Sequence, residues 1–131
     1  MIELAVEYFL VVFLMCLAVI QTAGNYNHLA GIVFIQNRLV SFIVSAMTLV
    51  PCTILLLTWN RRNETGIVEG AQQFGLFMAA LVGSILLTAL ITSITNHARF
   101  KNNTQPLGTG VEALRNRTYF QAMRLRLRSS K

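Results

Sequence analysis

Residues 74–96 have the sequence FGLFMAALVGSILLTALITSITN and contain no charged side chain. A helix rises 1.5 Å per residue, so this run would form a helix about 34 Å long. The hydrocarbon core of a bilayer is about 30 Å thick. The stretch is therefore long enough to cross a membrane as a single helix.

The two sides of this expected helix carry different residue types. Gly75, Ala79 and Gly83 repeat every four residues, and beside them runs a second file of small or polar residues, Ala80, Ser84, Thr88, Thr92 and Asn96. In lipid, helices associate through close backbone contact and hydrogen bonds. We expect the helix to pack, within the protein or against another subunit, through Gly75, Ala79, Gly83, Ser84 and Thr88.

The composition extends this interpretation to the whole chain. Of 131 residues, 54% are hydrophobic and 12% are charged, against about 25% charged in a soluble domain. The apolar residues fall in three blocks, which predict spans at about 4–22, 39–59 and 74–96. We expect an all-α integral membrane protein with a three-span membrane domain (1–100). Residues 101–131 would form a flexible linker and a basic, partly helical cytoplasmic tail.

The first span begins with two glutamates and no basic residue, which argues against a cleaved signal peptide. Glu7 lies about one helical turn inside the apolar block. It is expected at the headgroup level, or else as a partner for an arginine of a neighbouring subunit or as a proton site. Gly24 to Asn27 have turn chemistry. The apolar run 29–35 is either an in-plane segment or an extension of the next helix.

The second span carries a seam of small residues. Ser41, Ser45, Thr48 and Cys52 follow a 4-3-4 spacing, as in a left-handed helix pair. This seam is a candidate packing partner for the small face of the third span. Trp59 falls at the end of the span, where indole rings favour the membrane–water interface.

Basic residues predict the orientation of the spans. Arg61 and Arg62 are the only two of the 11 basic residues expected on the side of the N-terminus, and the other nine fall on the opposite side. The positive-inside rule places the tail in the cytoplasm and the N-terminus outside. The membrane would be a bacterial or archaeal plasma membrane or an organellar inner membrane.

The tail concentrates arginines among apolar side chains. A capping box at Thr109 and Glu112 predicts a helix from about Gly110, although the alternation of arginine and leucine over 124–128 also suits an extended segment. Anionic lipids or an acidic soluble subunit are the expected partners, and nucleic acid is not. The docking residues would be Arg115, Arg117, Arg124, Arg126 and Arg128.

His28 and His97 are the only histidines, and both fall just past a span on the inner side. Such a pair suits a haem, pigment or quinone, although interfacial histidines without a ligand are the simpler interpretation. We predict no metal and no resident cofactor. The sequence contains no Asp, no Cys cluster and no catalytic motif, so an enzyme is not expected.

Three functions remain open. The favoured one is a non-catalytic accessory subunit of a multi-subunit membrane complex, whose partners are other integral membrane subunits. The second is a self-oligomerising pore protein, because the short three-span layout is similar to that of phage class I holins in topology alone. The third is a membrane anchor of a redox enzyme, with His28 and His97 as cofactor ligands.

Overall fold

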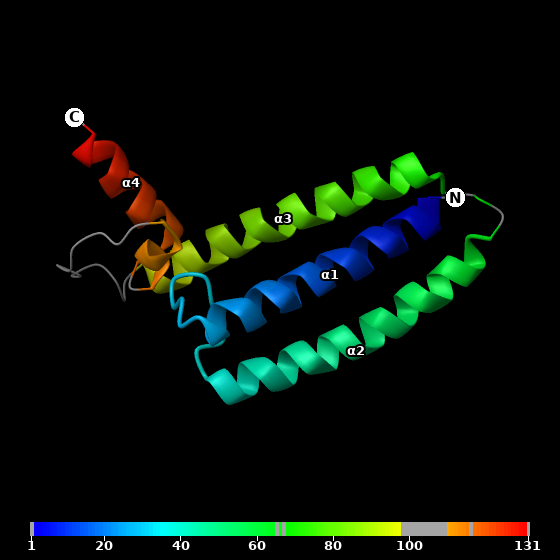
Figure 1. Cartoon of the computed structure of the whole chain (residues 1–131), viewed down its shortest axis with the longest axis horizontal. Coiled ribbons are helices and arrows are strands. Elements are labelled where there is room, and N and C mark those ends of the chain that lie inside the picture. Colours follow the sequence, from blue (N-terminus) through cyan, green and yellow to red (C-terminus); the bar gives the residue numbers. More distant parts are fainter. Residues whose placement is uncertain (1, 65, 67, 98–109, 116, 131) are drawn as a thin grey trace.

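The described residues of this computed structural model form helices joined by short segments, and none of them lies in a strand (Figure 1). They comprise residues 2–64, 66, 68–97, 110–115 and 117–130. The elements are α1 (Ile2–Tyr26), α2 (Arg38–Arg62), α3 (Gly70–Asn96), the short 3₁₀ helix η1 (Gly110–Leu114) and α4 (Tyr119–Ser129). The all-α prediction is therefore confirmed for this part of the chain.

Three of these helices are long and apolar enough to cross a membrane. α1, α2 and α3 contain the predicted spans 4–22, 39–59 and 74–96 and extend them by up to four residues at an end. The extra residues include exposed polar side chains such as Arg62 and Gln72. A helix that emerges into the headgroup region keeps its backbone hydrogen bonds while these side chains reach water.

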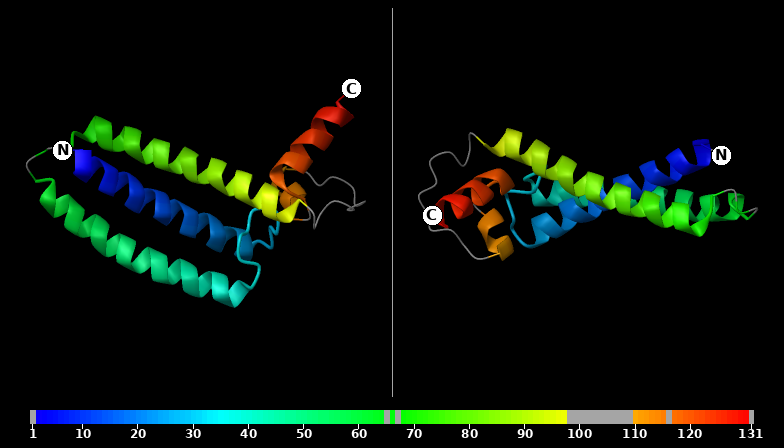
Figure 2. Two further views of the ribbon diagram at one scale, coloured as in Figure 1. Left: turned by 180° about the vertical axis from the view of Figure 1, so that it is seen from behind. Right: turned by 90° about the horizontal axis from the view of Figure 1, so that it is seen from above.

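The three long helices lie in a row with α1 in the middle (Figures 1 and 2). α1 contacts both α2 and α3 along its length, whereas the described residues of α2 and α3 make no contact with each other. The expectation that the serine seam of α2 pairs with α3 is therefore wrong. That seam faces α1, and α3 lies on the opposite flank of α1.

α1 continues through the predicted turn at Gly24 and ends after Tyr26. Its last carbonyls are satisfied by a Schellman motif, in which Leu29 N donates to Gly24 O at 2.8 Å and His28 adopts a φ of 57°. Gly24 lies within the helix, and its lack of a side chain lets the segment around Val33 pack closely against α1. A Cβ there would lie 2.9 Å from Cγ2 of Val33.

The segment between Tyr26 and Arg38 folds back over the end of α1, and α2 does not extend to Leu29. The Gln21 side chain holds this segment from inside, because its amide donates to Ile32 O at 3.2 Å and its oxygen accepts from Phe34 N at 2.8 Å. Asn37 then caps α2 by accepting from the first amides of that helix.

The tail forms two short helical pieces instead of one. η1 begins at the predicted Gly110, but α4 starts only at Tyr119. Thr118 N, at the N-cap of α4, donates to the Gln121 side chain at 3.3 Å. Thr109, the predicted cap, lies outside the described residues. The alternative of an extended segment at 124–128 is wrong, since those residues are helical.

Candidate functional site: helix faces and the basic end

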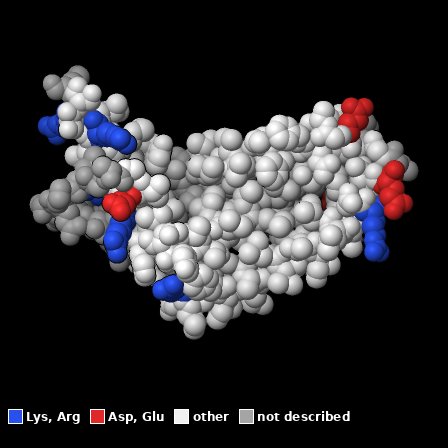
Figure 3. Space-filling model, in the orientation of Figure 1, with Lys and Arg blue, Asp and Glu red and all other residues white. Residues whose placement is uncertain are grey.

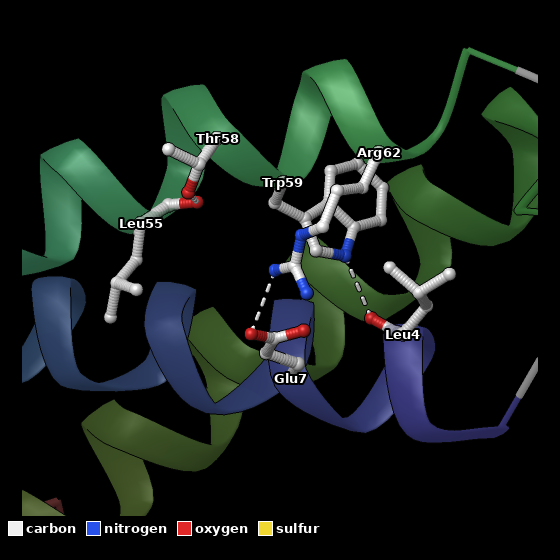
Figure 4. Close-up of polar contacts among 6 residues, drawn as sticks. All are labelled: Leu4, Glu7, Leu55, Thr58, Trp59 and Arg62. Atoms are coloured by element: carbon white, nitrogen blue, oxygen red, sulfur yellow. Dashed lines mark hydrogen bonds and ion pairs between the residues drawn. The ribbon is translucent and has the colours of Figure 1, made fainter.

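The α1–α2 interface is fixed at one end by Trp59 (Figure 4). The indole Nε1 donates to the Leu4 carbonyl at 2.9 Å, and the indole ring lies 4.7 Å from the ring of Tyr8, tilted by 43°. Only 2% of Trp59 is exposed. Trp59 therefore lies at the end of its span as expected, but it packs against α1.

Glu7 has a partner in its own chain. Arg62 of α2 lies beside it, with 2.8 Å between Arg62 Nη2 and Glu7 Oε1 (Figure 4). Both side chains remain well exposed. The pair closes the same end of the α1–α2 interface as Trp59, without requiring an arginine from a neighbouring subunit.

The opposite end of the α1–α2 interface is polar and buried. The Asn25 amide donates to Ser41 Oγ at 2.6 Å and to Ile35 O at 3.3 Å. Ser41 and Ser45 are buried against α1. Thr48 is half-buried, and its hydroxyl donates to Val44 O within α2 at 2.9 Å. The predicted seam residues Ser41 and Ser45 are thus occupied inside the chain.

α3 packs against α1 through the second of its two small files. Ala80 is fully buried and belongs to the same apolar cluster as Tyr8 and Val12 of α1. The remaining buried residues of α3 continue this file at four-residue intervals: Ser84, Thr88, Thr92 and Asn96. Ser84 and Thr88 therefore lie at an internal interface.

The other small file of α3 is divided between the interior and the surface. A Cβ at Gly83 would lie 3.5 Å from the Phe13 ring, so α1 already occupies that position. At Gly75 no described atom lies within 4 Å of a Cβ position, and Ala79 is exposed. Gly75 and Ala79 therefore form a small-residue patch that the described part of the chain leaves open.

Charge separates along the long axis of the molecule (Figure 3). The end near the N-terminus holds four of the five glutamates, Glu3, Glu7, Glu64 and Glu69, together with Arg61 and Arg62. The other end holds Glu112 and the described arginines Arg38, Arg115, Arg117, Arg124, Arg126 and Arg128. Four of the five predicted docking arginines are exposed, while Arg117 is half-buried and already engaged.

The tail is attached to the membrane helices at this basic end. Gly31 N donates to Leu114 O at 2.8 Å, and the Gln121 amide donates to His97 O at 3.4 Å. A Cβ at Gly31 would lie 2.6 Å from Leu114 O and closer still to Arg117 O. Only glycine allows the two backbones to approach this closely.

Each histidine lies at the C-terminal end of a long helix. His28 is the left-handed residue that ends α1, and His97 is the C-cap of α3. Both side chains are exposed. The described residues include no group of three or more His, Cys, Asp or Glu that would suit a metal ion.

Sequence reasoning overlooked Gln21, Asn25 and Gly31, the residues that hold the connection and the tail. A usable signal was present, because two amide side chains four residues apart at the end of an apolar helix need buried partners. Their partners are backbone groups and a serine of the following segments. A pattern based on side-chain polarity cannot identify backbone partners.

The three candidate spans indicate a multi-pass membrane protein. Comparison with protein families, curated proteins and solved structures finds no match to this chain. Its functional assignment therefore depends on the open patch of α3 and on the basic end.

Proposed function

We propose that this chain is a non-catalytic accessory subunit of a multi-subunit membrane complex. The observation that carries the proposal is the open patch at Gly75 and Ala79, next to a parallel file of α3 that α1 already covers. In lipid, small residues at a helix surface permit the close backbone approach that drives helix association. A neighbouring span of another subunit is the partner that suits this patch.

The row arrangement supports the same conclusion. Because α1 lies between the other two long helices, α2 and α3 each keep one lateral side without a helix of the described chain. No more than 22% of the most apolar window of any span is buried. A thin layer of this kind has little interior of its own and has two long edges at which other spans can be added.

The basic tail would dock at the inner surface of the membrane. Six of the eight described basic residues lie at the tail end of the spans, which favours a cytoplasmic location. The tail is held at this end by Gly31 and His97, so its arginines stay close to the membrane surface.

The test is a tagged purification from native membranes in mild detergent, with identification of the co-purifying polypeptides. Ala79→Leu places a large side chain on the open patch and is expected to reduce the recovery of companions severalfold. Ala46→Leu is the matched control, because Ala46 is an exposed alanine of α2 outside the patch. Stoichiometric companions that survive Ala79→Leu unchanged would contradict the use of this patch.

A self-oligomerising pore is the second candidate, and the two open edges favour it. Copies of the chain can add edge to edge, with the flank of α2 from one copy against the patch of α3 from the next. Purification would then yield oligomers of this chain without companions, and expression would be lethal to the host cell. Recovery of such oligomers alone would replace the subunit proposal with this one.

A further inference from the structure

The tail contains an apolar groove between η1 and α4. Its cavity has a volume of about 340 Å³ and is lined by Val111 and Leu114 of η1 and by Tyr119, Ala122, Met123 and Arg126 of α4. The lining is mostly hydrocarbon, with one guanidinium group. The described part of the chain contributes no side chain that fills this cavity.

The groove continues into an exposed apolar face of α4. At 100° per residue, Tyr119, Phe120, Met123 and Leu127 fall on one side of the helix, and each of them is between 44% and 66% exposed. Arg126 borders this side at one edge and Arg124 at the other. An apolar stripe flanked by arginines is typical of helices that lie in the interface of a membrane.

The position of α4 suits that environment. The first turn of the helix is held at the end of the spans through Gln121 and His97 O. From there α4 turns away from the direction of the three long helices, as Figures 1 and 2 show. α4 therefore begins beside the last residue of the third span, at the end of the molecule where the described arginines gather.

We propose that the groove and the apolar face of α4 bind the anionic phospholipids of the adjacent leaflet. The apolar side chains take up the upper acyl-chain region, and Arg124 and Arg126 pair with lipid phosphates at the two edges. A bilayer is within reach as soon as the spans insert, so its capture carries little of the entropic cost of recruiting a free partner. An acidic protein would leave the apolar face without a complementary surface.

This inference deepens the proposed docking of the tail at the membrane surface and rests on that docking, but it does not require partner subunits. The test uses the full-length chain in vesicles, with Cys16→Ala and Cys52→Ala introduced so that a single new cysteine carries an environment-sensitive fluorophore. Met123→Cys places the probe in the groove, and Leu125→Cys places a matched probe on the back of α4. Both positions are exposed, and emission from buried Trp59 checks that each variant is folded.

The vesicles contain phosphatidylcholine alone or phosphatidylcholine with phosphatidylglycerol, and brominated lipid is the quencher. The probe at position 123 should be quenched in the anionic vesicles, and the probe at 125 should remain in water. Arg124→Gln and Arg126→Gln should each reduce the partition of α4 into the bilayer about fivefold, and high salt should act in the same direction. Arg61→Gln, an exposed arginine at the other end, is the control and should have no effect.

Three results would overturn the proposal. Equal water exposure of both probes in anionic vesicles would exclude membrane binding by this face. Quenching that is identical in neutral vesicles and insensitive to Arg124→Gln and Arg126→Gln would exclude the anionic headgroup. Protection of position 123 only after addition of native membrane proteins would assign the groove to an acidic protein partner, whatever the outcome of the co-purification.

Discussion

The side-chain amide of Asn25 lies 2.6 Å from the hydroxyl oxygen of Ser41 and joins the last turn of α1 to the first turn of α2. Both residues are more than 90% buried. The same amide also reaches the Ile35 carbonyl at 3.3 Å. One side chain thus secures the end of a span, the start of the next span and the segment between them.

Ser41→Ala should therefore destabilise the α1–α2 pair by about 1 kcal/mol, because the buried amide loses its closest partner. The measurement is reversible unfolding in bicelles or mixed micelles. Ser93→Ala is the matched control, since the buried Ser93 hydroxyl has no partner among the described residues, and its removal should cost close to nothing. Equal costs for the two variants would show that the Asn25 contact contributes little.

Gly31→Ala should detach the tail from the spans. The new methyl group would collide with the carbonyls of Leu114 and Arg117, and overpacking of this kind costs about 1–3 kcal/mol. Hydrogen exchange of the η1 amides should then rise about tenfold or more, while exchange in α1 stays unchanged. Gly70→Ala is the control, because no described atom lies near that Cβ position. Unchanged exchange in Gly31→Ala would mean that the tail is held elsewhere.

His28→Gly should leave the protein as stable as the parent or up to about 1 kcal/mol more stable, because glycine removes the strain of a positive φ. His28→Val should cost about 1 kcal/mol or more. At His97, where φ is −57°, His97→Gly should be costlier than His97→Val because glycine loses more backbone entropy on folding. Thermal unfolding of the four variants measures this reversal. Loss of a visible absorption band in His28→Gly would instead indicate a cofactor ligand.

Trp59 is the single tryptophan of the chain, so intrinsic fluorescence reports the α1–α2 interface directly. With 2% of its surface exposed, Trp59 should emit at short wavelength and resist quenching by iodide in detergent. Tyr8→Ala removes the ring packed on the indole and should make the emission quenchable. Phe77→Ala, on the exposed side of α3, is the control. A quenchable Trp59 in the parent protein would place the indole in the headgroup region.

The sequence was sufficient to predict the three spans, because apolar blocks of this length have one stable environment. Residues 74–96, for example, lie entirely within α3. The helix ends were harder to predict. Gly24 resembles a turn residue, yet α1 continues through it because the glycine is used for contact with Val33.

The lateral order of the helices could not be predicted from the sequence. The serine seam of α2 and the small files of α3 would suit any close neighbour, so they do not identify one another. The side of α1 that receives α3 carries Phe13, and Val12 lies in the same buried cluster as Ala80. Such residues have the same composition as a lipid-facing surface. Only the path of the chain places these large residues against Ala80 and Gly83.

The central position of α1 has a consequence for the order of biosynthesis. A nascent chain that ends before Gly70 already holds both partners of every contact between α1 and α2, including Trp59 with Leu4 and Asn25 with Ser41. The first two spans can therefore pair while α3 is still being translated. α3 then needs only the far flank of α1, so each helix meets its partner as soon as it leaves the translocon.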